Sequence, residues 1–264
     1  MAIPPLSSRE ARVFPSTTPA ASSEGRRQTE HLFLILLAFD TAQGALSAAV
    51  RDGKEELASL FEERTRGHAE ALMPMVETVL AEAALGFADL DALAVTVGPG
   101  TFTGLRVGLA AARGIALSRG LPLVGVTTLE AIAEPVAAEA DEIVLASFDA
   151  RRDEVYMQAF SADGPERTEP LLVALGDVLS RLPLGPLVLS GTGTPLMTDI
   201  LAASGRPFRT SATRPQPDAS AVARMAVRRL GERGAQAFLT PPAPLYIRAP
   251  DAKLPGGRDP GEAV

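Results

Sequence analysis

A pattern that occurs twice in the 264-residue chain restricts the fold more than any other feature. The stretch "LLAFDTAQGALSAAV", which starts at Leu36, aligns with "LASFDARRDEVYMQAF", which starts at Leu145. Each copy has an apolar run of strand length, an aspartate, a polar turn and a second strand, which is the pattern of a β-hairpin. Asp40 and Asp149 then occupy equivalent positions, and we predict two pseudo-repeated α/β lobes with a cleft between them.

Helices and strands are predicted to alternate after the first hairpin. The segment 68–83 has apolar residues at helical spacing, and Pro74 must either kink this helix or lie in its first turns. A strand, a helix and a strand then form a βαβ unit, which is expected to be right-handed, over residues 92–97, 103–118 and 121–126. A late helix over 218–231 has Asp218 as its expected N-cap, and whether it returns to the first lobe is left open.

The ends of the chain differ in composition from its middle. Residues 1–30 are rich in Pro, Ser, Thr and Ala without a sustained period, so we predict that they are disordered. Residues 249–264 have a similar composition and are predicted to be loose. The folded part is therefore expected to comprise a first lobe over residues 31–130 and a second over 131–248.

Composition also excludes several kinds of chemistry. The chain has no Cys, which rules out disulfides, thiolate metal sites and a cysteine nucleophile, and suits a cytoplasmic location. A formal net charge of −7 argues against tight binding to nucleic acid without a partner. The arginine pair before the apolar run 32–39 resembles a twin-arginine export signal, but the run is short, and a buried strand is the preferred interpretation. No run approaches the roughly 18 apolar residues of a membrane span.

The stretch "VTVGPGTFTGLRVG" lies between a predicted strand and a predicted helix, where free N–H groups attract anions. It lacks the lysine of a P-loop, and its glycines do not have the spacing of a dinucleotide fingerprint. Thr101 or Thr103 is more simply the N-cap of the helix. The candidate residues beside an anion or nucleotide are Asp40, Thr41, Gly98, Gly100, Thr101 and Thr103.

Two lobes that each open with strand, Asp, turn and strand are similar to the actin, hexokinase and Hsp70-like ATPase superfamily. Within it, the chain resembles the TsaB (YeaZ) family over about residues 33–254, and the matching stretches occur in the same order as in that family. The blocks "GPGTFTGLRVGLA" and "DARRDEVY" are the most specific. The other matching stretches are "ILLAFDTAQGALSAAV", "HAEALMPMVETVLAEA", "LVGVTTLEAIA" and "PLYIRAPDAKLP".

This resemblance implies a bacterial subunit of the machinery that attaches threonylcarbamoyl to the adenosine 3′ of the anticodon, in tRNAs reading codons that start with A. TsaB is the dimerisation partner of the catalytic subunit TsaD, and the ATPase TsaE joins them. Contact with tRNA is expected only through the complex, and no membrane contact is implied. The resemblance implies no cofactor of the subunit's own, and leaves open a homodimer and ATP or ADP at the joint between subunits.

The role of Asp40 has two interpretations. In the superfamily its carboxylate would orient magnesium or water beside a phosphate; alternatively, it closes a tight hairpin by bonding its own backbone. The second hairpin carries Arg151 and Arg152 where the superfamily has small residues, so we expect side chains to fill that phosphate turn. We assign no catalytic residue, with an active phospho- or carbamoyltransferase and a nucleotide-binding regulator as the alternatives.

The helix over 103–118 is apolar around too much of its circumference to be covered on one side only. The resemblance implies that this helix and the one starting at His68 pair with a partner subunit. The "HAEAL" sequence has Leu72 where the catalytic paralogue has the second His of an H-x-x-x-H metal motif, so we expect no metal site. The residues predicted at the interface are His68, Leu72, Met73, Met75, Val76, Gly104, Leu105, Gly108, Leu109 and Ala112.

Overall fold

The first repeat forms the predicted hairpin, and a third strand extends it. The computed structural model describes residues 34–163 and 168–248, so the predicted terminal segments lie outside the described residues. Strands β1 (Ile35–Asp40) and β2 (Ala45–Asp52) pair antiparallel, and β3 (Glu55–Glu63) pairs with β2. No residue of β3 is buried, because β3 lies at the edge of the sheet. The apolar residues of its sequence "EELASLFEE" do not alternate regularly with polar ones, so the sequence did not predict this strand.

The predicted βαβ unit completes the first sheet. Its elements are β4 (Ala92–Thr96), α2 (Phe102–Arg119) and β5 (Leu123–Val126), and β1, β4 and β5 run parallel. The strand order is β3-β2-β1-β4-β5. Helix α1 (His68–Glu82) precedes this unit and contains Pro74 in its second turn.

The second sheet repeats the topology of the first. Its strand order is β10-β9-β6-β7-β8. If β6 is taken as the equivalent of β1, β7 of β2, β8 of β3, β9 of β4 and β10 of β5, this is the strand order of the first sheet, read from its other edge. The two-lobed α/β fold predicted from the repeat is therefore confirmed. The strands are β6 (Ile143–Arg151), β7 (Glu154–Ser161), β8 (Leu171–Ala174), β9 (Leu187–Ser190) and β10 (Phe208–Thr210).

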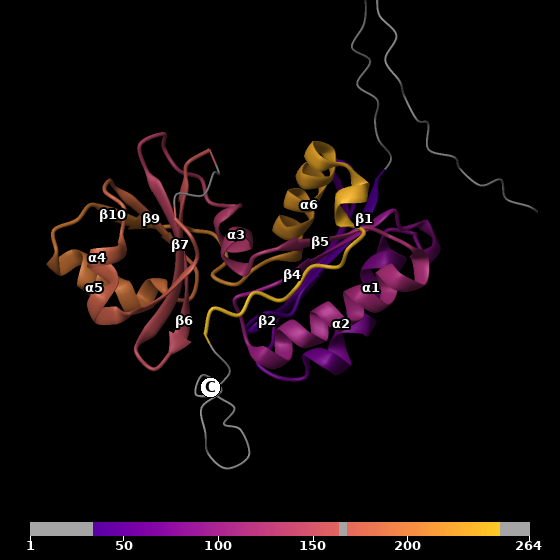
Figure 1. The fold of residues 1–264 in the computed structure, drawn as a ribbon, viewed down its shortest axis with the longest axis horizontal. Helices are drawn as coiled ribbons and strands as arrows, with labels where there is room; N and C mark the ends of the chain where they lie inside the picture. Colours follow the sequence, from indigo (N-terminus) through magenta and orange to yellow (C-terminus); the bar gives the residue numbers. More distant parts are fainter. Residues whose placement is uncertain (1–33, 164–167, 249–264) are drawn as a thin grey trace, which may run out of the picture. The chain divides into compact units, whose positions relative to one another are not determined.

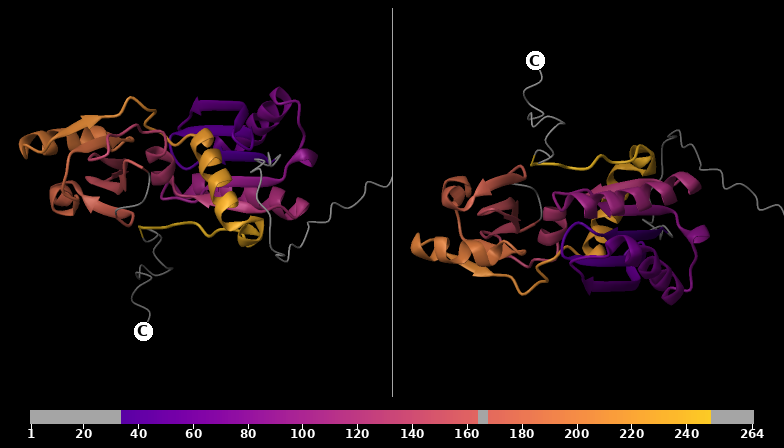
Figure 2. Two further views of the ribbon diagram at one scale, coloured as in Figure 1. Left: turned by 90° about the horizontal axis from the view of Figure 1, so that it is seen from above. Right: turned by 90° about the horizontal axis from the view of Figure 1, so that it is seen from below.

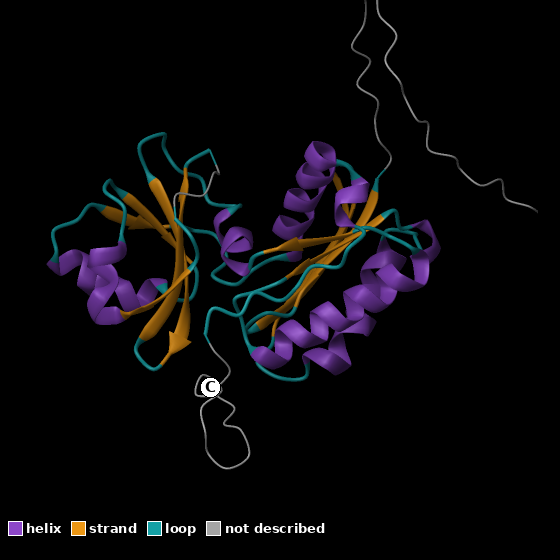
Figure 3. Cartoon of the chain, viewed as in Figure 1, coloured by secondary structure: helices purple, strands orange, loops and turns teal. Residues whose placement is uncertain are grey.

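Helices cover both faces of the first sheet (Figures 1 and 3). Alternate residues of β1 point to opposite faces: Leu37 and Phe39 pack under α1 and α2, and Leu36 and Ala38 pack under α6 (Ala219–Arg233). The predicted cap of α6 is present, because the Oδ1 of Asp218 accepts a hydrogen bond from the Ser220 N–H at 2.9 Å. The late helix thus returns to the first lobe.

The second sheet is also covered on both faces (Figure 2). Helix α3 (Thr128–Ala133) packs on one face, and α4 (Val178–Arg181) and α5 (Thr194–Ala203) pack on the other. Short 3-10 helices, η1, η2 and η3, cover Phe87–Asp89, Leu175–Asp177 and Ala235–Phe238. None of the helices in the described ranges is long and apolar enough to span a bilayer.

Candidate functional site: the two hairpin turns and the helices beside them

The turn between β1 and β2 is covered by the beginning of α2. The Thr41 hydroxyl donates a hydrogen bond to the Gly104 carbonyl at 2.7 Å, and the Thr101 N–H donates to the Ala42 carbonyl at 2.8 Å. A β-carbon at Gly104 would overlap the Thr41 carbonyl oxygen, and one at Gly100 would lie 2.6 Å from the Ala42 carbonyl oxygen. The glycines therefore let the helix backbone contact the turn directly.

Asp40, at the end of β1, has no exposed surface. Its Oδ1 accepts hydrogen bonds from the Thr96 hydroxyl at 2.5 Å and the Ala42 N–H at 3.2 Å, whereas Oδ2 has no partner among the described residues. Burial raises the pKa of Asp40 to about 7, against the lowering effect of the Thr96 hydrogen bond. Asp40 and Thr41, which were predicted to lie beside an anion or nucleotide, have no exposed surface and do not line the two cavities described below.

The second hairpin turn uses its carboxylate differently. The Arg151 N–H donates a hydrogen bond to the Asp149 carboxylate at 2.7 Å, and the Arg151 guanidinium forms an ion pair with the same carboxylate at 3.0 Å. The Arg151 side chain is 85% exposed, so it neutralises the carboxylate from the solvent side without being packed into the turn. This corrects the expectation that it fills the turn, and it leaves the Asp149 carboxylate engaged within its own hairpin.

Two cavities adjoin these turns. The larger, of about 740 Å³, is lined by residues of both hairpin turns, and the smaller, of about 400 Å³, lies at the N-terminal ends of α1 and α2. Gly100 lines the larger cavity, Thr103 the smaller, and Thr101 both. Gly98 lines neither cavity, because a β-carbon there would lie 2.6 Å from the carbonyl oxygen of Leu245.

The arginines of the larger cavity already have carboxylate partners. Arg64 pairs with Glu62 at 2.7 Å, Arg151 pairs with Asp149, and Arg248 pairs with Glu154. A phosphate entering this cavity would have to compete with a carboxylate for each guanidinium. The cavity therefore has the position of a nucleotide cleft but little of its phosphate-binding chemistry.

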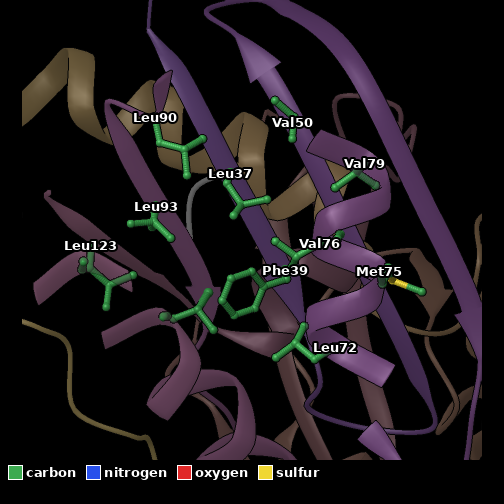
Figure 4. Close-up of a cluster of buried hydrophobic side chains, with 14 of the residues drawn as sticks. Leu37, Phe39, Val50, Leu72, Met75, Val76, Val79, Leu90, Leu93 and Leu123 are labelled. Carbon is green, nitrogen blue, oxygen red and sulfur yellow. The ribbon is translucent and has the colours of Figure 1, made fainter. Parts of the chain in front are cut away.

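Most of the residues predicted to contact a partner are buried inside the chain itself. Figure 4 shows Leu72 and Val76 of α1 pointing toward Phe39 of the sheet. On α2 the small residues face the first hairpin, since a β-carbon at Gly108 would lie 2.5 Å from the Thr41 hydroxyl. The residue set is therefore corrected, because eight of its ten members are core residues: Leu72, Met75, Val76, Gly104, Leu105, Gly108, Leu109 and Ala112.

His68 and Met73, the other two members, are half-buried. The Nε2 of His68 lies 3.2 Å from the carbonyl oxygen of Ala45, which ties the start of α1 to β2. Among the described residues no group of three or more His, Cys, Asp or Glu side chains is placed to hold a metal ion.

The outer faces of α1 and α2, which the sequence reasoning missed, carry opposite charges. The exposed residues of α1 include Glu70, Pro74 and Glu77. Those of α2 include a stripe at helical spacing, made of Phe102, Arg106, Ala110, Arg113, Gly114 and Leu117. The Arg106 guanidinium lies 3.5 Å from the centroid of the Phe102 ring. The sequence also has a parallel stripe of small residues on this helix, Gly104, Gly108, Ala112 and Ala116, which recur every four residues and were the more conspicuous signal.

Comparison with known proteins agrees with this architecture. The family model of TsaD, tRNA N6-adenosine threonylcarbamoyltransferase, matches residues 60–254. An uncharacterized protein of Mycobacterium tuberculosis is 38% identical over 221 residues, which cover 83% of this chain and 93% of that protein.

Two further matches carry the family name. The tRNA threonylcarbamoyladenosine biosynthesis protein TsaB of Escherichia coli is 36% identical over 183 residues, which cover 66% of this chain and 78% of that protein. The solved structure of YeaZ from Pseudomonas aeruginosa superposes with a TM-score of 0.63 at 27% identity and covers 81% of this chain and 99% of that one. From these matches and the repeated topology, the chain belongs to the TsaB (YeaZ) family, within the larger family described by the TsaD model.

Proposed function

We propose that this chain is the non-catalytic partner of a TsaD-type transferase in the formation of threonylcarbamoyladenosine in tRNAs that read codons starting with A. Membership of the TsaB family supports a role in this process, since the Escherichia coli relative is named as a tRNA threonylcarbamoyladenosine biosynthesis protein. The observation that carries the non-catalytic role is the burial of Asp40. The aspartate that would orient magnesium or water in a phosphotransferase has no exposed atom, which argues against the enzyme alternative.

We further propose that the outer faces of α1 and α2 contact the TsaD-type subunit. Acidic residues on α1 and basic residues on α2 give two adjacent stripes of opposite sign, which favour a partner of complementary pattern. The small residues Ala110 and Gly114 allow another helix to approach α2 closely. Leu117, which is 86% exposed, offers apolar area at the end of the same stripe.

Gly114→Leu is expected to weaken binding to the TsaD-type subunit about 5- to 150-fold, because overpacking a helix contact costs about 1–3 kcal/mol. A β-carbon at Gly114 has no heavy atom within 4 Å, so the isolated subunit should keep its circular dichroism and melt at a temperature no lower than that of the wild type. Titration calorimetry with purified subunits measures the change.

Gly231→Leu is the matched control, since Gly231 is also an exposed glycine within a helix and a β-carbon there meets nothing within 4 Å. It lies on α6, so its affinity should equal that of the wild type. Equal affinities for all three proteins would place the interface elsewhere, and equal losses in both variants would remove the argument for α2.

The remaining partners complete the proposal. A TsaE-type ATPase joins the complex, tRNA contacts the complex and not this subunit alone, and ATP or ADP binds at the joint between subunits. A homodimer would use the same outer faces and would therefore compete with the TsaD-type subunit. We place the complex in the cytoplasm.

A further inference from the structure

The segment Leu239–Arg248, here called the strap, runs in extended form along α2 and the ends of β4 and β5 (Figure 1, yellow). The Arg113 guanidinium donates a hydrogen bond to the Pro242 carbonyl at 2.6 Å, and the Leu245 N–H donates to the Val97 carbonyl at 2.7 Å. Both bonds attach the strap to the first lobe.

The last residues of the strap bind the second lobe. Ile247 packs against the apolar cluster beneath α3. The Arg248 guanidinium donates to the Ala150 carbonyl at 2.9 Å, pairs with the Glu154 carboxylate and lies 5.9 Å from the centroid of the Tyr156 ring. A single ten-residue segment thus connects the β4–α2 region with the turn of the second hairpin.

Two covalent connections also join the lobes. The chain enters the second lobe at α3, whose Leu129 and Ile132 belong to an apolar cluster of that lobe, and it leaves after Thr213, whose hydroxyl lies 3.1 Å from that of Ser190. The strap is bound at Ala150 and Glu154, at the turn of the second hairpin. Two connections permit hinge rotation of one lobe against the other, whereas a third attachment, made by a strap that is bonded to both lobes, opposes it.

We propose that the strap holds the two lobes at one fixed opening, so that the cavity between the hairpin turns does not open and close. Arg248 is both the end of the strap and part of the wall of that cavity. In a hinge-bending enzyme such a cavity closes around its ligand. In this chain the strap makes the pair of lobes a rigid platform, a property that does not depend on the identity of the partner.

The test uses the absence of Cys from the chain. Cysteines introduced as Lys54→Cys and Ala203→Cys lie at exposed positions of the first and second lobes and accept spin labels. The distance distribution between the labels should be narrow in the otherwise wild-type chain and at least about twice as wide with Arg248→Ala. Hydrogen exchange at the Leu245 amide should accelerate about 10-fold or more, since Arg248 contributes charge-assisted hydrogen bonds.

Arg206→Ala is the matched control, because the Arg206 guanidinium also bonds a carbonyl, that of Gly185 at 2.9 Å, but within the second lobe. It should change neither measurement. If Arg248→Ala does not fold, Glu154→Gln removes the carboxylate partner alone and is interpreted in the same way. A wild-type distribution and exchange rate in the variant, or equal broadening with Arg206→Ala, would overturn the proposal.

Discussion

Gly104→Ala is expected to lower the free energy of unfolding of the subunit by about 2–3 kcal/mol, the upper part of the range for overpacked cores. The added methyl group would overlap the carbonyl oxygen of Thr41. The conflicting atom is backbone, so relief requires moving α2 away from the β1–β2 turn. That movement would also stretch the 2.7 Å hydrogen bond from the Thr41 hydroxyl to Gly104. Urea denaturation followed by circular dichroism measures the loss.

Gly114→Ala, on the same helix, provides the control. A β-carbon at Gly114 meets nothing within 4 Å, so this change should raise the free energy of unfolding by about 0.5–1 kcal/mol through helix propensity. Opposite signs at the two positions would establish that α2 packs its small residues inward on the turn. Equal effects would contradict that packing.

The stability of the subunit is expected to fall by about 3 kcal/mol as the pH rises from 4 to 7, because of Asp40. The pKa of Asp40 is about 7 in the folded protein, against 3.8 for an exposed aspartate as in the unfolded chain. Within this pH window the folded chain therefore keeps a proton that the unfolded chain releases. Above about pH 8 Asp40 is ionised in both states, and this contribution becomes constant.

Asp40→Asn should remove this dependence and make the protein more stable than the wild type at pH 8. At pH 4 the stabilities of the two proteins should differ little, since Asp40 is then protonated in the folded chain and only partly ionised in the unfolded chain. The difference between the two curves isolates Asp40 from the other titrating groups. Parallel curves from pH 4 to 8 would show that Asp40 is not a buried carboxyl of raised pKa.

Local patterns in the sequence predicted most of the fold. The repeated strand–Asp–turn–strand pattern identified both hairpins, and the spacing of apolar residues identified α1, α2 and α6. These elements bury the residues that form the pattern, so the signal and the structure have the same cause. Strand β3 and the strap were missed because neither has a buried apolar face with a regular period.

The direction of the small-residue stripe on α2 was not predictable from periodicity. A stripe that includes Gly104, Gly108 and Ala112 indicates close approach by some neighbour, but not which neighbour. In the structure the neighbour is the Thr41 turn of the same chain. The raised pKa of Asp40 could not be predicted from the sequence either, because it follows from three-dimensional burial by residues distant in sequence.

Reconstitution of the modification reaction tests the non-catalytic role most directly. The assay combines this chain, a TsaD-type subunit, a TsaE-type ATPase, ATP, a threonylcarbamoyl donor and tRNA, and measures modified adenosine. We expect no product and no ATP hydrolysis from this chain alone, loss of product when it is omitted, and a rate within about twofold of wild type when it carries Asp40→Asn. Turnover by the isolated chain, or an assembled complex that Asp40→Asn inactivates, would contradict the account.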